Sequence, residues 1–240
     1  MKKPFAAAAI AAIAVAGCTS ARGEDGGPTV QRNYDIGAFE RIEVAGNYEV
    51  DVRTGSEPGV SASGPEKSIE RMVVEVDGDT LTIHPKKRGG LNIGWSSGDP
   101  VRLIVTVPRL RAAEIAGSGA IKVDRVAGDS FEGGVAGSGD LQLGQVEVGQ
   151  LKMGIAGSGE INAGTGRARS VQYDIAGSGD IDAAGLAAEQ AKVSIAGSGN
   201  VQANATKTAF VDIAGSGDVR MSGGAQCTVN KAGSGDVHCS

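Results

Sequence analysis

The chain has 240 residues and a mass of 24.0 kDa, with 39 glycines but only one Trp, three Tyr and four Phe. So few aromatic residues argue against the core of an ordinary globular enzyme, and 40% hydrophobic residues with seven prolines exclude collagen and a simple disordered tract. The formal net charge of −5, without a long basic run, gives no electrostatic footprint for nucleic acid. These features leave a repetitive fold with a thin core of small aliphatic side chains.

The N-terminus has the features of an export signal. Lys2 and Lys3 precede an apolar stretch over residues 5–17, which is too short to span a bilayer as a helix. We therefore interpret residues 1–17 as a signal peptide and predict an exported protein.

Residues 15–18 (VAGC) resemble the lipobox of bacterial lipoproteins, in which cleavage before the cysteine frees its thiol for a lipid. Cys18 is therefore the predicted lipid attachment site and the link to a membrane, and residues 18–28 are a predicted flexible tether. Because Thr19 rather than Asp follows the cysteine, we expect sorting to the outer membrane. The alternative is ordinary signal cleavage after residues 19–21 (TSA), which would leave a periplasmic or secreted protein.

The tetrapeptide Ala-Gly-Ser-Gly occurs seven times, with spacings of 20, 20, 20, 20, 18 and 18 residues between successive alanines. Repeats of this period are typical of solenoids. Hydrophobic and polar residues alternate on both sides of the motif, as strands with one buried face require. We predict an all-β fold whose main part, residues 112–240, is a parallel β-helix (solenoid) of about 20 residues per coil, with two short strands around each turn. The motif alanines are Ala116, Ala136, Ala156, Ala176, Ala196, Ala214 and Ala232.

The preceding segment, residues 29–111, is interpreted as a β-rich N-terminal cap together with the first coils. Residues 44–52 match residues 175–183 position by position in character, so the solenoid is expected to begin there. A short helix is predicted over residues 65–71, and strands over residues 73–76, 80–83 and 101–107. Such a cap would cover the open edge of the stack.

Two features mark the C-terminal end. Lys231 replaces isoleucine in an inward column, which a continuing coil would tolerate poorly, so the solenoid is expected to end there. Cys227 and Cys239 both fall in inward columns beside the final turn, and export would place them in an oxidising compartment. We predict a disulfide between them; the alternative is two small buried thiols that never meet.

A row of acidic residues directly follows the motif, and stacking would align it along one outer edge. Neighbouring carboxylates about 4.8 Å apart repel, which would favour cations, with calcium as the candidate ligand. The alternative is that each carboxylate caps a backbone N–H of its own turn. The motif serines, from Ser118 to Ser234, are expected to hydrogen-bond through their hydroxyls between turns. The acidic row is Asp140, Glu160, Asp180, Asp218 and Asp236.

No catalytic constellation is evident. Some parallel β-helices cleave polysaccharides with clustered acids, which draws attention to Asp174, Asp180 and Asp182 of one coil. His84 and His238, the only histidines, lie near no plausible nucleophile. We predict neither a catalytic residue nor a metal centre.

The segment Phe39-Glu40-Arg41-Ile42-Glu43-Val44, the strand over residues 101–110 ending in Val-Pro-x-Leu, and the Gly-Ser-Gly coils together resemble the head GIN domain family of auto-transporter adhesins. The resemblance covers residues 36–240. It implies a β-helical module outside the cytoplasm, lipid-anchored or secreted, without established enzymatic activity.

These features together predict a non-enzymatic cell-envelope or surface module, an adhesin-like β-helix with a rigid binding surface. Its expected partners are a membrane, through the lipid anchor, and a surface glycan or an envelope protein. The alternatives are a polysaccharide-active enzyme and a periplasmic self-assembling scaffold. Lys231 and the N-terminal cap argue against end-to-end stacking, so we expect a monomer.

Overall fold

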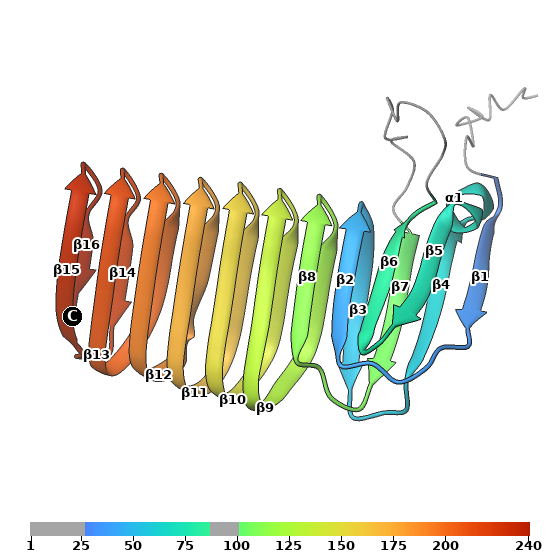
Figure 1. Cartoon of the computed structure of the whole chain (residues 1–240), viewed down its shortest axis with the longest axis horizontal. Helices are drawn as coiled ribbons and strands as arrows, with labels where there is room; N and C mark the ends of the chain where they lie inside the picture. Colours follow the sequence, from blue (N-terminus) through green and yellow to red (C-terminus); the bar gives the residue numbers. More distant parts are fainter. Residues whose placement is uncertain (1–26, 87–100) are drawn as a thin grey trace, which may run out of the picture.

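The computed structural model describes residues 27–86 and 101–240. The predicted signal peptide, Cys18 and all but the last two residues of the predicted tether lie outside these ranges. The described residues form a long parallel β-solenoid with an antiparallel cap at its N-terminal end (Figure 1). The predicted fold class is therefore confirmed.

Four central coils share one register. Strands β9 (Ala120–Gly137), β10 (Asp140–Gly157), β11 (Glu160–Gly177) and β12 (Asp180–Gly197) pair in parallel with an offset of 20 residues. Strand β13 (Asn200–Gly215) follows after two residues are lost at the bend opposite the motif. Each strand continues through that bend, so a coil contains one long strand rather than the two short ones expected.

The Ala-Gly-Ser-Gly turns stack because glycine lets successive backbones approach closely. Gly177 adopts φ of +136°, a conformation that side chains disfavour, and the equivalent first glycines of the other motifs do the same. The N–H of Ser178 donates to the carbonyl of Gly157 in the preceding coil at 2.8 Å, and this bond recurs at every motif. The prediction that serine hydroxyls form this ladder is wrong, because in the described chain the backbone amides make these bonds and the motif hydroxyls make none.

A continuous aliphatic core fills the space between the two sides of each coil. The inward columns predicted from alternation are buried, including the large side chains of Phe131, Leu141 and Tyr173. Among the described residues, no charged side chain is buried in this core, and the polar groups on its buried side chains are the phenols of Tyr48 and Tyr173. Burial of small aliphatic groups at about 25 cal/mol per Å² thus stabilises a chain that contains few aromatics.

The parallel pairing of the solenoid extends to the N-terminal side of the first Ala-Gly-Ser-Gly motif. Strand β2 (Arg41–Gly46) pairs in parallel with β8 (Ala112–Gly117), aligning Val44 with Ile115, and β3 (Tyr48–Thr54) pairs with β9. On the other side of this coil, β6 (Thr80–Pro85) pairs with β2, and β7 (Val101–Val107) pairs with β3. Residues 41–54 therefore form a complete coil ahead of the motif repeats.

The cap consists of three antiparallel strands and one helix. Strand β5 (Met72–Asp77) pairs with β6, β4 (Gly59–Pro65) pairs with β7, and β1 (Thr29–Tyr34) pairs with β4. Helix α1 (Glu66–Glu70) lies between β4 and β5 in the chain, as predicted, and buries Ile69. Among the described residues, no helix is long and apolar enough to cross a membrane.

Three short strands form the last described part of the solenoid. Strand β14 (Val219–Ser222) and strand β15 (Gln226–Gly233) both pair with β13, and β16 (Val237–Cys239) pairs with β14. Lys231 stands in register with Ile213, in the inward column, yet it is exposed because no described coil follows. Its Nζ donates to the carbonyl of Gly235. A disulfide between Cys227 and Cys239 joins β15 to β16.

Candidate functional site

Each coil presents two outer faces, because the chain reverses at the Ala-Gly-Ser-Gly turn (Figure 1). The strands that run up to the turn form one face, which we call the leading face. It comprises β2, β8, β15, residues 130–137 and their equivalents in β10–β13. The surface of the strands that follow the turn is the trailing face; it comprises β3, β14, β16, residues 120–123 and their equivalents. The two faces differ sharply in chemistry.

The leading face carries a polar groove along the solenoid axis. It has a volume of about 680 Å³ and extends from Arg41 and Arg111 near the cap to Thr228 in the last coil. One outward row in the groove contains only uncharged hydroxyl and amide side chains, and none of them hydrogen-bonds to another group in the described chain. At about 4.8 Å per coil this row is about 24 Å long. It consists of Ser130, Gln150, Ser170, Gln190, Thr208 and Gln226.

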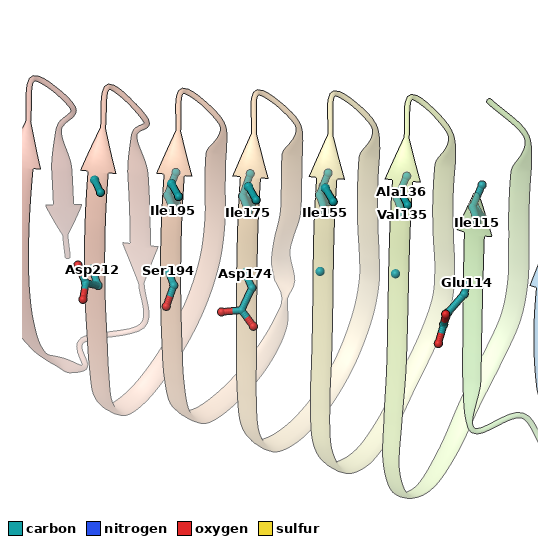
Figure 2. Close-up of a pocket in the computed structure, with 16 residues that line it drawn as sticks. Glu114, Ile115, Val135, Ala136, Ile155, Asp174, Ile175, Ser194, Ile195 and Asp212 are labelled. Atoms are coloured by element: carbon teal, nitrogen blue, oxygen red, sulfur yellow. The ribbon is translucent and has the colours of Figure 1, made fainter. Parts of the chain in front are cut away.

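A second, apolar groove lies beside the first and nearer the turns, with a volume of about 570 Å³. The exposed motif alanines form its upper part, and the buried side chains of Val135, Ile155, Ile175 and Ile195 lie beside them in the neighbouring inward column (Figure 2). The adjacent row carries Glu114 and Asp174 but has glycine at positions 134 and 154 between them. The missing side chains leave the backbone accessible over two coils.

The charges of the leading face largely balance one another. Arg41 pairs with Glu114 at 3.3 Å, and Lys152 pairs with Glu132 at 2.9 Å. The two grooves together are lined by equal numbers of cations and carboxylates, namely Arg41, Arg111, Lys152 and Lys192 against Glu114, Glu132, Asp174 and Asp212.

Phe210 is an exposed aromatic residue within the polar groove. Its side chain retains 37% exposure and occupies an outward position between Lys192 and Thr228 of the neighbouring coils. Sequence reasoning missed this residue, although its place between the inward residues Ala209 and Val211 marks it as outward. The groove itself had no sequence signal, because its shape depends on the side chains of several coils.

The acidic row lies on the trailing face and serves partly in turn structure. Asp180 Oδ1 accepts the backbone N–H of Asn200 at 3.0 Å, and Asp218 Oδ1 accepts that of Asp236 at 2.8 Å. These carboxylates therefore cap the following coil rather than their own turn. Asp140 and Glu160 have no such bond, because the N–H one coil later donates to a glycine carbonyl. In the described part of the chain, no group of three or more His, Cys, Asp or Glu is placed to hold a metal ion.

The carboxylates considered for catalysis do not come together. Asp174 lies on the leading face, where it accepts a hydrogen bond from Gln172 at 2.7 Å, whereas Asp180 and Asp182 lie on the trailing face. The hydrophobic core separates these faces. His84 lies on β6 and contacts Glu75 of the cap strand β5 at 3.3 Å, and β2 separates β6 from the first motif strand, β8.

The shifted pKa values have structural causes. Hydrogen bonds from Arg109 and Arg111 lower the pKa of Glu40 at the cap. The hydrogen bond to Glu132 raises the pKa of Lys152. Burial raises the pKa of Tyr173 in the core. Each shift follows from pairing or packing, and none marks a group prepared for acid–base catalysis.

Comparison with solved structures shows the same fold in proteins of low sequence identity. One from Bacteroides fragilis, described as a "putative adhesin", is 19% identical with a TM-score of 0.82, covering 88% of this chain and 97% of that one. One from Parabacteroides distasonis, described as a "putative lipid binding protein", is 24% identical with a TM-score of 0.72, covering 90% and 98%. A "putative adhesin" from Parabacteroides merdae is 19% identical with a TM-score of 0.66, covering 90% and 97%.

No functionally curated protein matches the chain. The family described as "Putative auto-transporter adhesin, head GIN domain" matches residues 38–225, from the loop between β1 and β2 to the bend before β15. That match covers most of the chain and includes both faces of the solenoid. The protein therefore belongs to the head GIN domain family.

Proposed function

We propose that the protein is an exported, non-enzymatic cell-envelope module that presents its leading face as a rigid adhesive surface. In this proposal a lipid on Cys18 attaches the chain to the outer membrane, and the residues after it connect the anchor to the solenoid. The family and the solved structures support an adhesin-like role by their descriptions.

The observation that carries the proposal is the unequal chemistry of the two faces. The leading face combines two grooves, an unpartnered row of hydroxyl and amide groups, and an exposed phenyl ring. The trailing face is acidic, and two of its carboxylates, Asp180 and Asp218, accept backbone N–H groups of the following coil. Free hydrogen-bonding groups on a rigid plane can bind a partner at little cost in ordering entropy.

The test compares two matched double variants in producing cells. Gln150→Arg/Gln190→Arg places bulky cations on the leading face, and Gln142→Arg/Gln202→Arg places them on the trailing face; all four glutamines are exposed. Attachment is counted on glass coated with envelopes of the same strain. We expect the leading-face variant to attach no better than cells lacking the protein, and the trailing-face variant to attach like wild type.

Two outcomes would contradict the proposal. One is equal attachment of wild-type cells and cells lacking the protein. The other is equal impairment by the two double variants, since the leading face would then have no special role.

A further inference from the structure

We propose that the polar groove of the leading face binds a neutral, extended polysaccharide that runs along the solenoid axis and stacks on Phe210. This inference rests on the proposed function and names the ligand class of the same face.

The polar row offers the hydrogen-bonding chemistry that sugars need. Hydroxyl groups and carboxamides both donate and accept hydrogen bonds, as sugar hydroxyls do. The six side chains from Ser130 to Gln226 have no partner in the described chain, so their bonding capacity is available to a ligand. The row runs straight through the groove over six coils, which matches a linear ligand rather than a compact one.

The row also has a period longer than one coil. Small hydroxyl residues alternate with glutamine, so chemically equivalent groups recur every second coil, for example Gln150 and Gln190. At about 4.8 Å per coil the repeat is about 9.6 Å. An extended polysaccharide presents equivalent groups at regular intervals along its length, whereas the surface of a folded protein does not.

Phe210 provides the apolar contact that complements these hydrogen bonds. The C–H face of a sugar ring packs on an aromatic ring through dispersion and burial of apolar surface. Phe210 lies in the groove, one row away from Thr208, and is 37% exposed. A ligand that covers the ring would remove this apolar surface from water.

The charge of the face favours a neutral polymer. Four cations and one carboxylate, Glu132, line the polar groove itself. Three of these cations are already paired: Arg41 with Glu114, Lys152 with Glu132 and Arg111 with Glu40. Lys192 is then the one cation of the groove without an ion pair in the described chain, which is too little positive charge to favour an acidic chain strongly. The acidic row on the trailing face would repel one.

The experiment uses the full-length protein, purified from outer membranes in detergent, and titration calorimetry. The probes are hexasaccharides and disaccharides of β-linked glucose, xylose, mannose and N-acetylglucosamine, with hexagalacturonate as the acidic control. We expect one or more neutral hexasaccharides to bind, each more tightly than its disaccharide, because the longer chain contacts more of the row. Phe210→Ala should weaken that binding by about tenfold.

Ile104→Ala is the matched control, because Ile104 is 41% exposed on β7, which continues the trailing face into the cap. It should bind like wild type, and thermal melting should show all variants folded. Gln190→Ala, which removes one amide of the row, should also weaken binding.

The proposal is overturned if no neutral hexasaccharide binds, if hexagalacturonate binds more tightly, or if Phe210→Ala and Gln190→Ala bind as wild type does. A negative result here, together with attachment that still depends on the leading face, would reject the ligand class and leave the adhesive function intact. Loss of both would reject the function itself.

Discussion

The second glycine of the motif provides a sharp test of how the coils are held together. A Cβ at position 179 would lie 2.5 Å from the carbonyl oxygen of Gly159 and 2.7 Å from Cγ2 of Ile155. One neighbour is backbone and the other is a buried core side chain, so neither can move away freely. Gly179→Ala should therefore force adjacent coils apart.

The expected cost follows from two effects. Overpacking of a tight core costs about 1–3 kcal/mol. Separation of the coils also weakens the hydrogen bond from the N–H of Asp180 to the carbonyl of Gly159, which is worth about 0.5–1.5 kcal/mol. Together they give a loss of about 2–4 kcal/mol in the free energy of unfolding, measured by urea denaturation followed by circular dichroism.

Gly154→Ala is the control, because it adds the same methyl group to a strand glycine on the leading face. The Cβ there would lie 4.0 Å from the nearest atom, the carbonyl oxygen of Asp174. This variant should be neutral or more stable by about 0.5–1 kcal/mol, since alanine orders a strand at lower entropic cost. Equal losses in the two variants, or no loss in Gly179→Ala, would refute the close-stacking argument.

Three further predictions concern titration and the last coil. Burial raises the pKa of Tyr173, so the contribution of its neutral phenol to stability is present below the unfolded pKa of about 10 and is lost as the pH rises further. The urea midpoint should therefore fall between pH 8 and 11, and the midpoint of Tyr173→Phe should fall less. Arg109 and Arg111 lower the pKa of Glu40, so the contribution of its carboxylate to stability is present above about pH 4.3 and is lost as the pH falls. Glu40→Gln should reduce the loss of stability in acid, measured by the urea midpoint, and an unchanged pH dependence would contradict the pairing. Cys227 and Cys239 are 12 residues apart, so reduction of their disulfide should lower the local free energy of unfolding by about 3 kcal/mol and increase hydrogen exchange in β15 and β16. Increased exchange throughout β9–β12 would contradict a local role.

The repeat architecture could be predicted because its information is local and repeated. The period of 20 residues places equivalent residues side by side, and alternation around the motif determines which of them face inward. The match of residues 44–52 to a later coil indicated a similar coil for the same reason, and β2 and β3 pair in parallel with β8 and β9. The shortened coil could likewise be placed, because two residues are missing only at the bend.

The features that could not be predicted depend on contacts between residues distant in sequence. The grooves form from outward side chains of several coils. Phe210 becomes a candidate binding residue only when the structure shows that it lies beside a row of side chains without hydrogen-bond partners. The serine ladder was assigned to hydroxyls because the sequence does not show that the serine N–H already reaches the preceding coil. The ion pairs of Glu40 with Arg109 and Arg111 join segments about 70 residues apart and follow from no local pattern.

The most direct test of the account is antibody access to an epitope tag after Ser240, measured on intact and permeabilised cells. We predict that intact cells with the wild-type chain are labelled and that this labelling is lost in Cys18→Ala, which lacks the predicted lipid attachment site. Labelling only after permeabilisation would contradict it, because a leading face enclosed in the periplasm could not attach the cell to an outside surface.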